Sequence, residues 1–224
     1  TGTGGMALTK VGAGTLTLSG TIGYGGLEWT RAGIGMWHGK ELSAGSSPMV
    51  HGFQLWIALP PELERAEPEA QYLGADLMPS IGPARLIVGT YQTGTSPARA
   101  PRGINYLLVT LKPGERWTYE PPGGHTVAWV AVSEGALSGS GRLSNGELVI
   151  FEPSEAPITF EGAEDTGATF VLGSAVPHPY ELHLGAYSVH TSADALAAGE
   201  RHIRELKERL DARGDRRTAS GSTA

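Results

Sequence analysis

Two apolar runs separated by a loop decide the fold of this chain. The sequence reads LEWTRAGIGMWHGKE over residues 27–41 and HGFQLWIAL over residues 51–59. Both runs are rich in the aromatic and branched residues that favour β-strands, and the loop between them holds Ser46, Ser47 and Pro48. The pattern therefore predicts a strand, a loop and a second strand.

The second run does not alternate between apolar and polar residues. Phe53, Leu55 and Trp56 stand close together in it, which is typical of a strand that is buried on both faces. We therefore expect this strand at the heart of a β-sandwich or barrel. We place Trp29 of the first run in the same core.

A glycine-punctuated segment, Gly33-x-Gly35-x-x-His38, closes the first run. Small residues there let other groups approach the backbone closely. His38 is either a hydrogen-bonded strand histidine or a metal ligand, and one histidine alone does not make a metal site. On an extended strand Lys40 shares the face of His38, and Glu41 points the other way unless a bulge at Gly39 shifts the register.

The composition limits the class of protein. The 224 residues could form one large domain or two smaller ones, and they include 33 Gly, 15 Pro and no Cys. Many glycines and prolines between apolar runs indicate short strands and turns. The lack of cysteine excludes disulfides and thiolate sites and fits a reducing, cytoplasmic location. A net charge of −6 argues against nucleic-acid binding, and no apolar run reaches membrane-spanning length.

Further strand signals recur at a spacing of about ten residues with Gly and Pro turns between them, which predicts an antiparallel sandwich or barrel. They cover residues 85–89, 104–111, 117–119, 125–132, 146–151, 158–160 and 168–173. Residues 60–83 are rich in proline and acidic side chains, so we expect the boundary between two barrels within 60–84.

A helix is predicted over residues 192–213. Thr191 is a good N-cap, with Asp194 three residues later as in a capping box. Four apolar side chains fall on one face of this helix: Leu196, Ile203, Leu206 and Leu210. We expect the helix to dock on a barrel and the polar residues 214–224 to be disordered.

Several of these residues resemble the pirin family of double cupins. The matching motifs are Glu28-Trp29, Ala32-Gly33-x-Gly35, His38 and the run 51–59, with a second match over residues 176–191. The resemblance implies an all-β bicupin, two jelly-roll-like antiparallel β-barrels with a C-terminal α-helix. It divides the chain into the rest of an N-terminal barrel, a linker, a C-terminal barrel, a segment with the helix, and a tail: residues 1–66, 67–83, 84–175, 176–213 and 214–224.

In the pirin family the first barrel holds iron through a His-x-His pair, a third His, and a Glu two residues after that third His. The resemblance places His38 at the third histidine and Lys40 at the glutamate position, so that Glu41 is the remaining substitute. His51 falls outside the metal shell, and Lys40 and His51 are expected to line the pocket. We expect the His-x-His segment to lie upstream of Thr1, in a longer protein, and iron to be absent or weakly bound here.

The other histidines give no second metal site. At the metal positions of the second barrel the resemblance places Trp117 and Tyr119, and His125 is predicted to be a loop or strand-end residue. Three histidines gather in the segment before the helix: His178, His183 and His190. Because their spacing puts the first two on opposite strand faces and the third beyond a Gly turn, we predict a structural tie rather than a metal cluster.

Two functions from different classes follow from the resemblance. One is a bicupin with a degenerate metal site, acting as a regulatory or binding module toward a protein partner or a flavonoid-like small molecule. The alternative is an iron-dependent dioxygenase of the quercetin 2,3-dioxygenase type, if the full-length protein supplies the missing ligands.

Overall fold

Antiparallel strands are the main regular structure of the described chain. The computed structural model describes residues 15–21, 27–36, 52–139 and 141–214. By its internal contacts the chain separates into two compact units. The first unit comprises Thr1–Leu73 and His178–Ala224, and the second comprises Gly74–Pro177.

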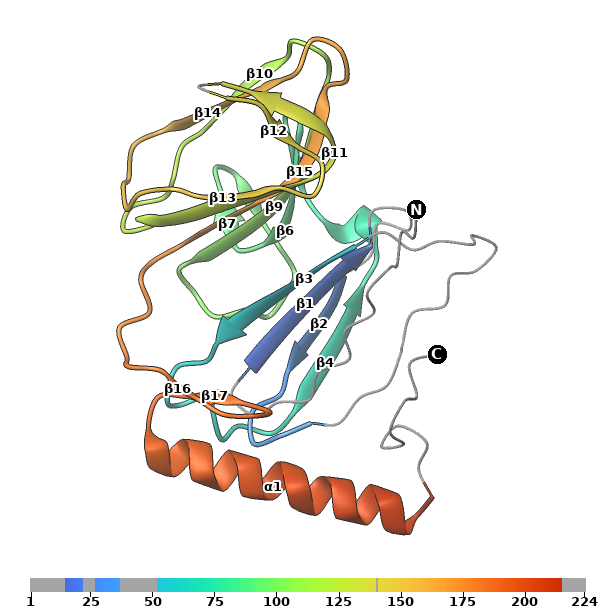
Figure 1. Cartoon of the computed structure of the whole chain (residues 1–224), viewed down its shortest axis with the longest axis vertical. Coiled ribbons are helices and arrows are strands. Elements are labelled where there is room, and N and C mark those ends of the chain that lie inside the picture. Colours follow the sequence, from blue (N-terminus) through green and yellow to red (C-terminus); the bar gives the residue numbers. More distant parts are fainter. Residues whose placement is uncertain (1–14, 22–26, 37–51, 140, 215–224) are drawn as a thin grey trace. The chain divides into compact units, whose positions relative to one another are not determined.

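The first unit contains a four-stranded antiparallel sheet in the order β3-β1-β2-β4 (Figure 1). Its strands are β1 (Thr15–Thr21), β2 (Leu27–Arg31), β3 (Gly52–Ala58) and β4 (Glu69–Leu73). The predicted strands of the two deciding runs are thus confirmed as β2 and β3. They lie on either side of β1, where Leu18 is the register partner of both Trp29 and Leu55.

The predicted core of this unit is confirmed for Trp29 and wrong for the second run. Trp29 is 0% exposed, whereas Phe53, Leu55 and Trp56 are only half-buried. Among the described strands β3 lies at an outer edge of the sheet and β2 lies inside it. An edge strand is covered from fewer sides, so an unbroken apolar run there does not mean burial on both faces.

β4 lies within the range that the sequence assigned to the connection between the barrels. It pairs along its whole length with β2, from Leu27 opposite Leu73 to Arg31 opposite Glu69. The guanidinium of Arg31 reaches the Glu69 carboxylate at 3.1 Å. The acidic and proline-rich residues before β4 hide this short strand in the sequence.

The second unit is built on one curled antiparallel sheet of nine strands (Figure 1). Its main path runs β10-β14-β11-β15-β9-β6-β5, and β12 and β13 both pair with β11. The strands are β5 (Ser80–Ile81), β6 (Ala84–Val88), β9 (Ile104–Leu111), β10 (Arg116–Tyr119), β11 (Val127–Ser138), β12 (Leu143–Ser144), β13 (Leu148–Ile150), β14 (Ile158–Gly162) and β15 (Ala168–Ala175). A hairpin of β7 (Thr90–Tyr91) and β8 (Gly94–Thr95) and a short 3₁₀ helix, η1 (Ala75–Leu77), complete the unit.

Apolar side chains from facing strands fill the interior of the second unit. Alternate residues of β9 contribute Leu107, Val109 and Leu111, all at most 2% exposed. Phe160 and Phe170 meet there with ring centroids 5.1 Å apart. The seven strand signals predicted for this part of the sequence all correspond to strands of this sheet.

The C-terminal part of the first unit is a hairpin followed by a helix. The hairpin consists of β16 (His183–Leu184) and β17 (Val189–His190), and it lies beside helix α1 (Ala193–Ala212) (Figure 1). The helix is where the sequence predicted it, but its N-cap is Ser192 rather than Thr191. The Ser192 side chain accepts a hydrogen bond from the Ala195 amide, which satisfies a free donor of the first turn. Among the described residues, no helix is both long and apolar enough to cross a membrane.

Candidate functional site

The glycine-punctuated segment of the first unit is a tight turn at the end of β2. Gly33 has φ +52°, and a Cβ there would lie 2.0 Å from the Ala66 carbonyl oxygen. The same oxygen accepts a hydrogen bond of 2.9 Å from the Ile34 amide. A Cβ on Gly35, at φ +139°, would lie 3.0 Å from the His202 ring of α1. The close approach predicted for these glycines is confirmed, and the approaching groups are a loop carbonyl and helix α1.

The residues predicted for the metal site fall outside the described part of the chain. These are His38, Lys40, Glu41 and His51. Within residues 15–21, 27–36, 52–139 and 141–214, no three His, Asp or Glu side chains lie together in a way that could hold a metal ion. The described residues therefore do not supply the donor set that iron requires.

The second unit holds a buried polar cluster, which we call the barrel cluster: Asn105, Tyr119, His125 and Ser174. Each of these residues is at most 6% exposed. The Ser174 hydroxyl shares hydrogen bonds with Tyr119 Oη at 2.7 Å and with His125 Nδ1 at 2.9 Å. The Asn105 amide nitrogen donates to Tyr119 Oη at 3.2 Å. The cluster thus joins the neighbouring strands β9 and β15 to the end of β10 and the loop that follows it.

Neighbouring groups hold the barrel cluster in place. The Asn105 side-chain oxygen accepts from the Thr90 amide at 3.0 Å. The Tyr91 ring stacks on the Tyr119 ring with centroids 4.8 Å apart. His125 lies in the loop before β11, as predicted. Burial raises the pKa of the Tyr119 phenol, and burial lowers the pKa of the His125 imidazole. Both groups are neutral near pH 7, so the cluster is a hydrogen-bond network without a carboxylate.

We expect Tyr119→Phe to lower the free energy of unfolding by about 1–3 kcal/mol, because a buried hydrogen-bonding group loses its partner. Ser174 and Asn105 would each lose a contact with the phenol oxygen. Urea denaturation followed by circular dichroism measures the loss. Thr118→Val is the matched control in the same strand as Tyr119. It removes an exposed hydroxyl contact of 2.9 Å to Thr159 of β14 and should cost no more than about 0.5 kcal/mol. Equal losses for the two variants would mean that the barrel cluster adds nothing to stability.

The three histidines before the helix do not come together as a group. His183 and His190 are register partners across the β16–β17 hairpin, and the chain turns between them at Gly185. His178 instead contacts the Tyr180 carbonyl oxygen at 3.2 Å. The spacing put His190 beyond a Gly turn, and the short hairpin brings it back opposite His183.

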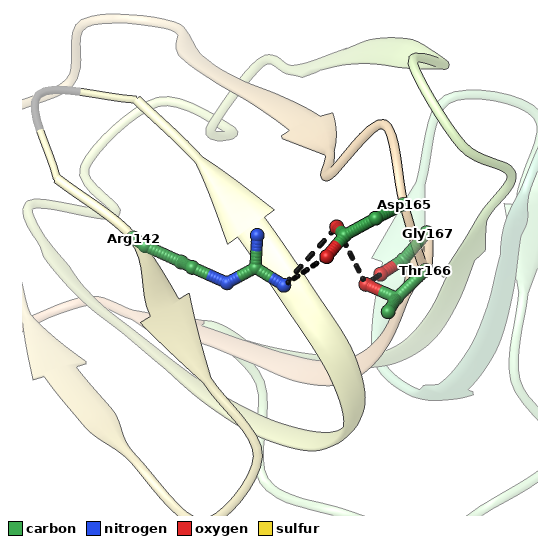
Figure 2. Close-up of polar contacts among 4 residues, drawn as sticks. All are labelled: Arg142, Asp165, Thr166 and Gly167. Atoms are coloured by element: carbon green, nitrogen blue, oxygen red, sulfur yellow. Dashed lines mark hydrogen bonds and ion pairs between the residues drawn. The ribbon is translucent and has the colours of Figure 1, made fainter.

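A surface ion pair joins two turns of the second unit (Figure 2). The Arg142 guanidinium donates to both oxygens of Asp165 at 3.0 and 3.1 Å. The Thr166 hydroxyl donates to the Gly167 carbonyl oxygen at 3.0 Å. Hydrogen bonding from Arg142 lowers the pKa of the Asp165 carboxyl. Both partners are more than half exposed, so this contact orders the turns and offers no enclosed site.

Comparison with known proteins agrees with this architecture. A "Pirin-like protein" of Caulobacter vibrioides is 28% identical over 186 residues, which cover 80% of this chain and 66% of the relative. A Pseudomonas aeruginosa protein named provisionally as a quercetin 2,3-dioxygenase is 27% identical over 173 residues, 71% of this chain and 59% of the relative. The chain thus spans less than two-thirds of either relative. No protein-family model matches it.

The fold is shared with a solved quercetin 2,3-dioxygenase from Acinetobacter baumannii. Its TM-score is 0.72 at 21% identity, over 88% of this chain and 77% of that one. The curled antiparallel sheet, the second sheet and the C-terminal helix are those of a bicupin, which confirms the predicted fold class. The sequence likeness to a pirin-like protein supports the predicted resemblance to the pirin family.

Proposed function

We propose that this chain is a pirin-like bicupin with a degenerate metal site that acts as a regulatory or binding module. The observation that carries the proposal is Lys40, which stands where the family resemblance requires a glutamate. A protonated ammonium has no lone pair for a metal and repels a divalent cation. Within this chain His38 is then left with Glu41 alone, and two donors do not make a tight iron site.

The interior of the second unit supports the same proposal. Tyr119, placed by the resemblance at a former metal position, is 0% exposed and hydrogen-bonded to Ser174. Its neighbours in the barrel cluster offer neutral amide, hydroxyl and imidazole groups, a poor set for iron. The second barrel on this proposal is a structural barrel, and the partner is a protein or a flavonoid-like molecule in the cytoplasm.

The alternative is an iron-dependent dioxygenase acting on a quercetin-like flavonoid. The name of the Pseudomonas aeruginosa relative favours it. An oxygenase of this kind needs a metal with open coordination positions, so it needs ligands beyond His38 and Glu41. A longer protein would have to provide them.

Metal analysis of the purified full-length protein separates the two functions. We expect far less than one iron per chain and no dioxygen uptake with quercetin. Lys40→Glu should hold more iron than the parent protein because it adds a donor. Lys40→Met is the matched control, which removes the charge without adding a donor and should leave iron low.

Near-stoichiometric iron in the unmodified protein, lost in His38→Ala and kept in His51→Ala, would refute the proposal. If dioxygen uptake with quercetin follows the iron through the same variants, the dioxygenase function is the correct one. Equal iron in Lys40→Glu and Lys40→Met would show that residue 40 is not a ligand position.

A further inference from the structure

Three ionisable side chains from separate segments of the first unit are buried close together. Glu64 follows β3 in the chain, His190 ends β17, and Glu200 lies in α1. They are 3%, 2% and 9% exposed. Buried charged groups are rare unless they are paired or hydrogen-bonded. We call this group the clasp.

Glu200 fastens the helix to the hairpin. One of its carboxylate oxygens accepts hydrogen bonds from the Tyr187 amide at 2.8 Å and from the Ser188 hydroxyl at 3.1 Å. A Cβ at Gly185 would lie 2.4 Å from that same oxygen, so the turn passes directly over the carboxylate. The hairpin and α1 therefore behave as one piece.

Glu64 fastens that piece to the rest of the first unit. Its Oε1 accepts a hydrogen bond of 2.5 Å from the Thr191 amide, 127 residues away in the chain. Its Oε2 lies 3.5 Å from His190 Nδ1. That distance is longer than a good hydrogen bond, and both ring nitrogens of His190 are buried without a hydrogen-bond partner.

The surroundings of His190 shift the pKa of its imidazole in opposite directions. Burial lowers the pKa of its imidazole most strongly and Arg65 acts in the same direction, while the charges of Glu64 and then Glu200 raise it. His183 is its register partner across the hairpin. Because burial prevails, the ring binds a proton more weakly in the folded chain than in the unfolded one. The stability it contributes is therefore present above the ordinary histidine pKa of about 6.5 and is lost as the pH falls through the lower folded value.

We propose that the clasp is an acid-sensitive latch. It holds the β16–β17 hairpin and α1 against the rest of the first unit at neutral pH and loosens them when His190 gains a proton. Loosening α1 would uncover the turn at Gly35, where His202 and Ile203 of the helix now lie within 3.5 Å of a Cβ position. The latch consists of described residues of the first unit and is independent of iron and of Lys40.

Hydrogen–deuterium exchange of the full-length protein at pH 7.5 and pH 5.5, corrected for the intrinsic exchange rate, tests the latch. We expect protection of residues 183–212 to fall about tenfold at the lower pH, because the opened form binds the His190 proton more tightly than the folded form does. Protection of residues 104–111 in the second unit should not change.

Two variants identify the sensor. His190→Gln keeps a polar side chain without a titrating ring, so the pH response of residues 183–212 should disappear. His202→Gln is the matched control on α1, where the histidine side chain is 28% exposed, and it should keep the tenfold response. An unchanged response in His190→Gln, a lost response in His202→Gln, or no response in the parent protein would overturn the proposal.

A third variant keeps the test decisive if His190→Gln disturbs the fold, which low protection of residues 183–212 at pH 7.5 would reveal. Glu64→Gln removes the negative charge that favours the protonated ring. The midpoint of the response should then move to lower pH. A midpoint that stays in place or moves to higher pH would show that His190 is not the titrating group.

Discussion

Trp29→Ala is expected to lower the free energy of unfolding by about 3–5 kcal/mol, the range for truncation of a large buried aromatic side chain. Trp29 is 0% exposed and lies on β2, an inner strand of its sheet. The Arg31 guanidinium lies over its ring at 6.0 Å from the centroid. Truncation therefore leaves a cavity and removes a cation–π contact. Urea denaturation followed by circular dichroism measures the change.

Trp56→Ala is the comparison that makes this prediction specific. Trp56 has the same side chain, but it is half-buried on the edge strand β3, so we expect its loss to be smaller by at least about 1 kcal/mol. Trp29→Phe should retain most of the stability, since the indole nitrogen of Trp29 has no hydrogen-bond partner to lose. If Trp29→Ala and Trp56→Ala cost the same, Trp29 is not the core residue of this sheet.

The strands and the helix could be predicted because their signals are local. Residues 104–111 form an apolar run between turn residues, and they fold as β9 with the same bounds. The helix followed from its periodicity and a nearby cap, although Ser192 rather than Thr191 holds the cap. Both residues have a hydroxyl, so the sequence could not decide between neighbours.

Burial in the first sheet could not be predicted in the same way. The run from Phe53 to Leu59 has the composition of a central strand, but its position in the sheet depends on which strands lie beside it. The pairing of β1 with both β2 and β3 places β3 at the edge of the described strands. Strand order is a property of the whole fold that a local pattern does not contain.

The buried polar groups were missed for a related reason. Asn105 is a buried polar residue in a mostly apolar strand, on the same face as Leu107. Nothing in the sequence connects it to Tyr119, His125 and Ser174, which come from other segments. The clasp could not be foreseen either, because Glu64 accepts its hydrogen bond from the amide of Thr191, 127 residues later in the chain. For the candidate metal site, His38, Lys40, Glu41 and His51 stay predictions.

Gly135→Ala is expected to lower the free energy of unfolding by about 3–5 kcal/mol, because backbone strain and a steric clash act together at this position. Gly135 lies in β11 at φ +67°, next to a register shift in its pairing with β15. A Cβ there would lie 2.2 Å from the Gly167 carbonyl oxygen. That oxygen also accepts the Ala136 amide at 2.9 Å, so it cannot move away without loss of a strand contact.

Gly82→Ala is the matched control, because it introduces the backbone strain without the steric clash. Gly82 has a similar φ of +58°, and nothing lies within 4 Å of the Cβ position. Its replacement should therefore cost only the left-handed conformation, about 1–2 kcal/mol. The difference between the two variants, measured by urea denaturation, is then the cost of separating β11 from the turn at Gly167. The backbone at Gly167 already lies close to β9, since a Cβ at that position would be 2.5 Å from the Leu111 carbonyl oxygen. The turn therefore has little room to move toward β9. A difference below about 0.5 kcal/mol, within the range of ordinary surface substitutions, would show that the turn yields freely and that the close contact does not constrain the second unit.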